Sequence, residues 1–231
     1  ATNYYTDANG IATIPGAGPI NATLTLSGRY SKVVTGANGT VSPTFSATGI
    51  ANNDVVNFPQ SSPNATERHF SAYYHTTLVH DFMKTKFPTF TTMDNPLTTR
   101  VDRTDGNCNA FYNGTSINFY TTANGCNALS QVNSVIYHEY GHGISDKFWT
   151  ANGSSFDNGG MGEGYSDVWS MAITKDPVVG KGFYVNQPNS FIRRYDINPK
   201  VYPFDIQGQV HADGEIIAGA WWDYAINLSS G

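Results

Sequence analysis

The run His138-Glu139-Tyr140-Gly141-His142 is a His-Glu-x-x-His motif. One helical turn separates the two histidines, so on a helix both imidazoles point the same way and can hold one metal ion from one side. Glu139 emerges about 100° away, which places it to act on water beside the ion rather than to bind the ion itself. Imidazole nitrogens suit zinc, which lowers the pKa of bound water toward about 7.

The motif is too rare to be explained by composition. The chain has 6 His and 4 Glu in 231 residues, and random placement gives roughly 0.003 expected copies of the pattern. The plain alternative is a surface helix with two histidines one turn apart. That alternative leaves Gly141 and Gly143 unexplained, because each glycine costs about 1 kcal/mol in a helix interior. The sequence therefore favours a metal site.

Helical periodicity surrounds the motif. Residues 130–145 are predicted to form an α-helix with Ser130 as its N-cap. The apolar face of this helix consists of Val132, Val135 and Ile136. Further helices are predicted over residues 67–86, 163–174 and 212–228.

A catalytic zinc ion usually has three protein ligands, so a third ligand must lie outside the motif. Glu163 begins the next predicted helix, after a Gly-rich segment that allows an antiparallel return. Asp167 follows one turn later on the same face, where a carboxylate could orient a ligand imidazole through its second nitrogen. The alternative for Glu163 is a carboxylate that stabilises a helix N-terminus. With the motif present, we favour the ligand.

These segments together resemble the gluzincin metallopeptidases, most closely the fungalysin type and its thermolysin-like relatives. The resemblance rests on residues 138–142 followed by Gly160-Met161-Gly162-Glu163-Gly164-Tyr165-Ser166-Asp167. Asn109-Ala110-Phe111-Tyr112 resembles the edge strand that holds substrate backbone, and residues 69–81 resemble the aromatic helix before it. His211-Ala212-Asp213-Gly214-Glu215 resembles the segment with the second catalytic histidine. The similarity covers about residues 65–228.

The resemblance implies a role for each matching residue. One zinc ion would be bound by His138, His142 and Glu163. Glu139 would take a proton from the attacking water and pass it to the leaving amine. His211 would hydrogen-bond the tetrahedral oxyanion. Asp167 would support a zinc ligand from outside, as the spacing also suggests.

Substrate-binding positions are implied in the same way. Asn109 and Ala110 would bind an extended peptide by strand addition. Val135 and Ile192 would line an apolar pocket for the side chain just after the cut, so an apolar residue is expected there. Arg193 would hold a substrate carbonyl. Its neighbour Arg194 is the alternative, and Ile192-Arg193 fits the fungalysin pattern slightly better.

Some features of the family have no clear match. The stretch 151–162 contains no Tyr like the one thermolysin-like relatives carry between the second motif histidine and the third ligand. Asp205 lies one position away from the place where a carboxylate usually supports the second catalytic histidine. Calcium is compatible with the resemblance, but no calcium cluster is recognisable in the sequence.

The expected fold class is α+β, a two-lobe thermolysin-like metallopeptidase with a mixed β-sheet and a helical lobe. The gluzincin-like catalytic domain is expected over residues 61–231, with a short or truncated C-terminal lobe. Residues 1–60 are expected to form a β-rich segment that loosely resembles a small carboxypeptidase-regulatory-like β-sandwich. Asn113-Gly114 predicts a hairpin turn between strands at residues 109–112 and 117–120.

Composition excludes several classes of function. With a net charge of -5 and a pI near 5.6, the chain has no excess of basic residues that could neutralise phosphates, so no nucleic-acid partner is expected. No apolar run approaches the roughly 18 residues of a membrane helix, so no membrane partner is expected. Cys108 and Cys126 enclose 17 residues. The two cysteines would form a disulfide in an oxidising compartment and would more often be free thiols in the cytosol.

Low charge (13%), many Thr, Asn, Gly and Tyr residues, and a start at Ala1 rather than Met favour a processed, exported protein. The favoured hypothesis is a secreted, monomeric zinc endopeptidase that cuts peptides or proteins by direct attack of water. One alternative is a degenerate zinc-containing module that binds peptides or surfaces without cutting, against which the retained Glu139 and His211 argue. Another is an adhesin or carbohydrate-binding protein.

Overall fold

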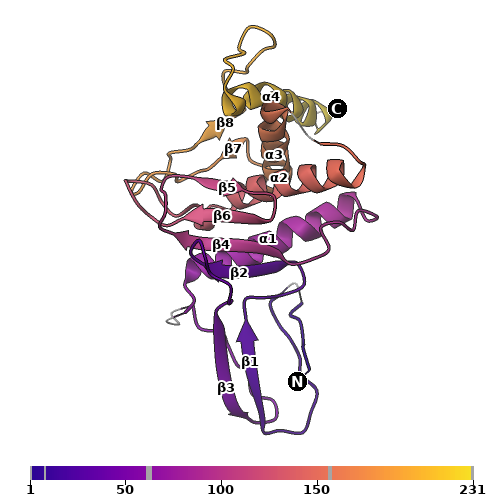
Figure 1. The fold of residues 1–231 in the computed structure, drawn as a ribbon, viewed down its shortest axis with the longest axis vertical. Helices are drawn as coiled ribbons and strands as arrows, with labels where there is room; N and C mark the ends of the chain where they lie inside the picture. Colours follow the sequence, from indigo (N-terminus) through magenta and orange to yellow (C-terminus); the bar gives the residue numbers. More distant parts are fainter. Residues whose placement is uncertain (1, 8, 61–63, 156–157, 230–231) are drawn as a thin grey trace.

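The computed structural model describes residues 2–7, 9–60, 64–155 and 158–229. The described part is a mixed α+β fold in which a sheet occupies the middle of the molecule (Figure 1). Helices α2, α3 and α4 lie toward one end of the long axis, and a narrow lobe built on β1 and β3 extends toward the other.

The central sheet has four strands in the order β2-β4-β6-β5. Neighbours are parallel among β2 (Ser31–Thr35), β4 (Leu97–Arg103) and β6 (Ser116–Tyr120). β5 (Ala110–Tyr112) is antiparallel to β6, which confirms the predicted hairpin. Among the described strands β5 pairs only with β6, so its outer edge is open to another strand.

Two helices and the sheet share one hydrophobic core. α1 (Glu67–Lys86) has the predicted bounds and packs against β2 and β4, while α2 (Asn133–Ala151) packs against β5. The core of this packing is formed by the buried side chains Val33, Ala72, Val101, Ile117, Phe119, Leu129 and Ile136. Because α2 is anchored in this core, the motif that it carries has a fixed position beneath the open edge of β5.

The predicted start of the motif helix is wrong. Ser130 lies in a separate 3-10 turn, Leu129–Gln131, and its buried hydroxyl has no hydrogen-bond partner among the described residues. α2 begins only at Asn133, after an extended Val132 with no side-chain cap. The short turn uses the backbone groups that an N-cap at Ser130 would have bonded.

The last two helices begin earlier than predicted. α3 (Gly159–Thr174) is capped by Asn158, whose Oδ1 accepts a hydrogen bond from Met161 N at 2.9 Å. α4 (Val210–Ser229) also extends beyond its predicted range. Between them, β7 (Val178–Val179) and β8 (Arg193–Arg194) form a short antiparallel pair.

The first 60 residues are β-rich, as expected. β1 (Ile20–Thr25) and β3 (Thr44–Ile50) form a two-stranded antiparallel sheet in the narrow lobe, whereas β2 joins the central sheet beside β4. The division of the chain at residue 60 therefore remains a prediction.

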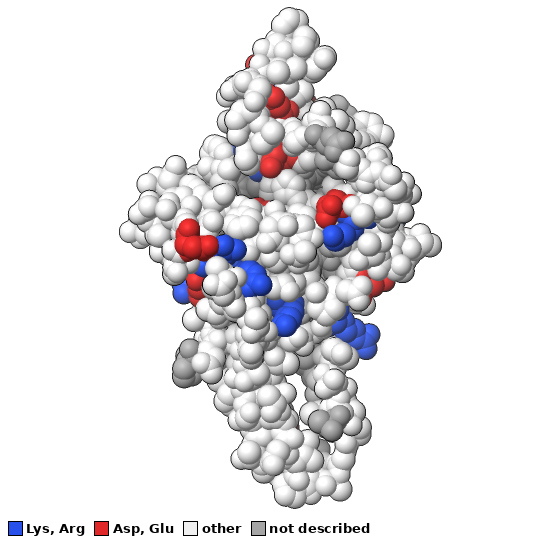
Figure 2. All heavy atoms as spheres, viewed as in Figure 1, with Lys and Arg blue, Asp and Glu red and all other residues white. Residues whose placement is uncertain are grey.

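On the face in Figure 2, charged side chains gather around the middle of the molecule, and the narrow lobe shows none.

Cys108 and Cys126 are joined in a disulfide. Among the described helices, none combines the length and the apolar content needed to cross a bilayer.

Candidate metal centre

The motif helix and α3 approach each other closely because a glycine lies at their contact. A Cβ atom added to Gly141 would lie 3.0 Å from Cα of Ser166 and 3.3 Å from its Oγ. A larger residue would push the helices apart. The glycine within the motif therefore has a packing reason, and its consequence is that both motif histidines of α2 face Glu163 of α3.

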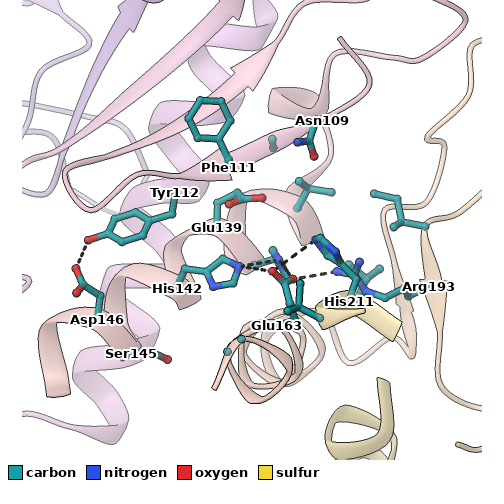
Figure 3. A pocket seen from close by; sticks show the side chains of 18 of the residues that line it. Asn109, Phe111, Tyr112, Glu139, His142, Ser145, Asp146, Glu163, Arg193 and His211 are labelled. Atoms are coloured by element: carbon teal, nitrogen blue, oxygen red, sulfur yellow. Dashed lines mark hydrogen bonds and ion pairs between the residues drawn. The ribbon is translucent and has the colours of Figure 1, made fainter. Parts of the chain in front are cut away.

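Three residues with potential ligand atoms converge at this contact (Figure 3). The Nε2 atoms of His138 and His142 are 3.1 Å apart, and they lie 3.2 Å and 3.5 Å from the carboxylate oxygens of Glu163. The ligand atoms of the three residues all lie within 4.8 Å of one another. Buried Oε2 of Glu163 accepts no hydrogen bond from any described residue. A cation fits such an arrangement, and two imidazoles with one carboxylate are a donor set that suits zinc.

Asp167 fixes the orientation of the first histidine. Its Oδ1 accepts a hydrogen bond from Nδ1 of His138 at 2.6 Å, while Arg193 donates from Nε at 2.6 Å and from Nη2 at 2.9 Å. The hydroxyl of Tyr195 donates to the same carboxylate. With its hydrogen on Nδ1, His138 presents the lone pair of Nε2 to a metal ion. Tyr195 follows β8 in a segment for which the sequence offered no periodic signal.

The two adjacent arginines have different surroundings. Arg193 is largely buried against Asp167, whereas Arg194 is half-exposed and pairs with Asp196 at 2.5 Å. Successive residues of a strand point to opposite faces, so β8 can direct only one of them toward the site. The structure places Arg193 at the cleft, and its contact with substrate stays a prediction.

Electrostatics keep a lone pair of His142 available and draw a positive charge to His138. Burial and the neighbouring His138 lower the pKa of His142 to about 4, so this imidazole is neutral near pH 7. Burial alone would raise the pKa of Glu163, but the adjacent histidines outweigh it and lower the pKa to about 2. For His138 burial acts in the opposite direction and would lower the pKa, but the carboxylates of Asp167 and Glu163 outweigh burial and raise the pKa. A cation can replace the proton that these carboxylates attract.

Glu139 lies at the cleft beside the three convergent residues without being one of them. The side chain is buried, and this burial raises its pKa to about 7. A carboxyl group with such a pKa can both accept and release a proton near neutral pH. The surroundings of Glu139 therefore suit a general base, and this role remains a prediction.

His211 reaches the same place from α4. Its Nε2 lies 3.5 Å from Oε1 of Glu163, and its Nδ1 lies 2.8 Å from Nε2 of Gln209. Oε1 of Gln209 accepts the backbone N–H of Ala212, which fixes the orientation of the amide. The amide N–H therefore donates to Nδ1, and the neutral imidazole carries its hydrogen on Nε2, toward the site.

Gln209 is a supporting residue that the sequence analysis did not identify. Gln209, and not Asp205, contacts the histidine; the carboxylate of Asp205 accepts the backbone N–H of Val201 at 2.7 Å. Because Gln209 is two residues from the histidine, the support is local, although nothing in the sequence marks this glutamine.

The three convergent residues, His138, His142 and Glu163, line a cleft of about 1000 Å³. Each of the five predicted substrate-binding residues lines it: Asn109, Ala110, Val135, Ile192 and Arg193. Further apolar side chains on the lining come from Leu129, Val179 and Phe183. The open edge of β5 borders the same cleft, so an extended chain lying there could reach both the strand and the metal centre. Substrate binding by these residues stays a prediction.

Comparison with known proteins identifies the family. The profile of the fungalysin metallopeptidases matches residues 89–230. The chain belongs to this family. A second profile, for the catalytic domain of thermolysin metallopeptidases, matches residues 4–146, and the two together confirm a fungalysin-type, thermolysin-like metallopeptidase.

Individual relatives agree with this assignment. Extracellular metalloproteinase 2 of Phaeosphaeria nodorum is 33% identical over 113 residues, which cover 41% of this fungalysin-type chain and 18% of the relative. Extracellular metalloproteinase 1 of Arthroderma otae is 31% identical over 127 residues, covering 47% and 20%. The matches therefore span about a fifth of the length of these curated relatives.

A solved structure shares the fold. The precursor of protealysin, a metalloproteinase from Serratia proteamaculans, superposes with a TM-score of 0.56 at 17% identity, covering 93% of this chain and 71% of that chain. The predicted α+β, thermolysin-like fold class is thereby confirmed.

Proposed function

We propose that this fungalysin-type protein is a secreted zinc endopeptidase that hydrolyses peptide bonds with water and prefers an apolar residue just after the cut. The observation that carries the proposal is the convergence of His138, His142 and Glu163 beside the buried carboxyl group of Glu139. This convergence lies in a cleft that the open edge of β5 borders.

The substrate would bind as an additional strand. An extended peptide antiparallel or parallel to β5 can exchange backbone hydrogen bonds with Asn109 and Ala110. The side chain just after the cut would enter the apolar part of the cleft, near Val135 and Ile192. Because Arg193 uses Nε and Nη2 to bind Asp167, its Nη1 hydrogens are left for a substrate carbonyl.

When bound, zinc supplies a Lewis acid that lowers the pKa of water and polarises the scissile carbonyl. Glu139 would accept a proton from the attacking water and deliver it to the leaving nitrogen, for which its raised pKa is suited. His211 would donate its Nε2 hydrogen to the oxygen that becomes negative in the transition state. Asp167 would hold His138 in the tautomer that leaves Nε2 free to bind the ion.

Secretion and a monomeric state are part of the same proposal. The relatives described above carry the word extracellular in their names. The disulfide between Cys108 and Cys126 suits an oxidising compartment. Substrates would be peptides or unfolded proteins, since strand addition reads backbone more than sequence.

The proposal is tested by casein cleavage with and without the chelator phenanthroline, combined with zinc analysis. Glu139→Gln should keep one zinc ion per chain and lose roughly 100-fold or more of the activity, because the base is removed while the ligands stay. The exposed Glu67 of α1 provides a matched control, and Glu67→Gln should cleave like the unaltered protein.

Two results would overturn the proposal. Chelator-insensitive cleavage, or near-normal activity of Glu139→Gln, would contradict the mechanism. Stoichiometric zinc without cleavage of any peptide would instead indicate a module that binds peptides without cutting them.

A further inference from the structure

Helices α3 and α4 pack so closely at two glycines that no side chain would fit at those positions. A Cβ atom added to Gly164 would lie 2.0 Å from Cγ2 of Ile217 and 2.6 Å from the carbonyl oxygen of Gly214. A Cβ atom added to Gly214 would lie 2.8 Å from the carbonyl oxygen of Gly160 and 2.9 Å from N of Gly164. Real Cβ atoms essentially never approach other atoms within 3.0 Å.

This glycine contact lies directly behind the metal centre. The same added Cβ of Gly214 would also lie 2.8 Å from Cβ of Glu163, the ligand on α3. His211 precedes Gly214 by three residues on α4, so the two residues lie on neighbouring turns of one face. The close contact at Gly214 therefore lies between Glu163 and the helix that carries His211, whose Nε2 lies 3.5 Å from Oε1 of Glu163.

We propose that Gly214 is a positioning residue for the reaction, because it sets how far the His211 imidazole lies from the ligand set. The inference rests on the proposed function, in which His211 stabilises the developing oxyanion. His211 is half-exposed, and it contacts Gln209 of its own segment and Glu163 across the helix contact. Its position relative to the ligands thus depends on how closely α4 packs on α3.

The atoms that oppose a side chain at position 214 cannot yield easily. The carbonyl oxygen of Gly160 and the nitrogen of Gly164 belong to the backbone of α3, so a methyl group must move a helix rather than rotate a side chain. Misplacement of a catalytic group by about 1 Å can cost roughly 100-fold in rate. Because His211 would act mainly on the transition state, the loss should appear in kcat and leave KM unchanged.

A graded series of glycine substitutions tests the inference. Gly214→Ala should lower kcat about ten- to hundred-fold, with unchanged KM and one zinc ion per chain. In Gly160→Ala the added Cβ meets Cβ of Asp213 at 3.2 Å, a milder conflict across the same contact, so kcat should fall about threefold. This second variant keeps the test available if Gly214→Ala does not fold.

The matched control is Gly219→Ala on the same helix. Gly219 is buried, but an added Cβ would meet only Cδ1 of Tyr195, at an ordinary 3.9 Å. We expect this variant to keep its kcat and to be slightly more stable to heat, as compatible glycine replacements in helices are.

Two further measurements separate positioning from general damage. If Gly214 acts through His211, Gly214→Ala should have little additional effect in a His211→Ala background, because the two substitutions disturb one interaction. Crystal structures of the metal-free proteins should show a His211–Glu163 distance longer than 3.5 Å in Gly214→Ala and unchanged in Gly219→Ala.

Equal fold-losses from Gly214→Ala with and without His211, or an unchanged distance, would overturn the inference. Absence of zinc-dependent cleavage by the unaltered protein would instead overturn the proposed function. The inference about Gly214 would then still be tested by the His211–Glu163 distance in the crystal structures.

Discussion

Replacing Asp167 by Asn keeps the size of the side chain but removes the negative charge opposite Arg193. In the folded protein Asp167 is 1% exposed, and it accepts hydrogen bonds from His138, Arg193 and Tyr195. An amide in its place offers only one acceptor oxygen. The guanidinium of Arg193 would then be left as a buried charge without a carboxylate partner.

The expected magnitude follows from this burial. Removing one partner of a buried ion pair typically costs about 3–5 kcal/mol. For a chain of this size each kcal/mol shifts Tm by about 2–4 °C, so Asp167→Asn should lower Tm by roughly 6–20 °C. Loss of the carboxylate that orients a ligand imidazole should also weaken zinc binding about 10- to 100-fold.

Thermal unfolding of the metal-free proteins measures the first effect, and competition with a zinc-binding dye measures the second. Asp196→Asn is the matched control, because Asp196 pairs with the neighbouring Arg194 at the surface. Exposed ion pairs contribute little, so this variant should unfold like the unaltered protein. A Tm for Asp167→Asn that equals that of Asp196→Asn, with unchanged zinc affinity, would refute the reasoning.

Two other properties can be predicted. Replacing Cys108 and Cys126 together by Ser should cost about 3 kcal/mol, because the disulfide closes a short loop, and Tm should fall by roughly 6–12 °C. An unchanged Tm would contradict this reasoning, because it would show that removing the disulfide does not raise the conformational entropy of the unfolded chain. Burial lowers the pKa of His75 to about 4 from its ordinary 6.5, so the unfolded state binds a proton more readily and the metal-free protein should lose stability as pH falls from 6.5 to 4. His75→Asn, which can still accept a hydrogen bond from Tyr137, should reduce that loss, and an identical pH dependence of Tm in both proteins would contradict the assignment.

The parts of the fold that depend on near neighbours could be predicted from the sequence. The bounds of α1 and the hairpin at Asn113-Gly114 follow from helical periodicity and from a turn preference. The prediction that the motif helix starts at Ser130 was wrong, because the 3-10 turn that contains Ser130 uses the same backbone groups. The place of β2 in the central sheet could not be predicted, since it pairs with β4 more than 60 residues away.

The candidate site divides in the same way. One helical turn between His138 and His142 places both imidazoles on one side of a helix whatever the rest of the chain does, so the sequence alone determined that a metal could bind there. Only the tertiary structure decided that Glu163 lies beside both histidines and that Arg193 rather than Arg194 meets Asp167. The position of Glu163 depends on how closely α2 and α3 cross, and that distance is limited by the backbone contact at Gly141, whose partner Ser166 lies far away in the sequence. The choice of Arg193 depends on which face of β8 is turned toward Asp167, and this is decided by the packing of β8.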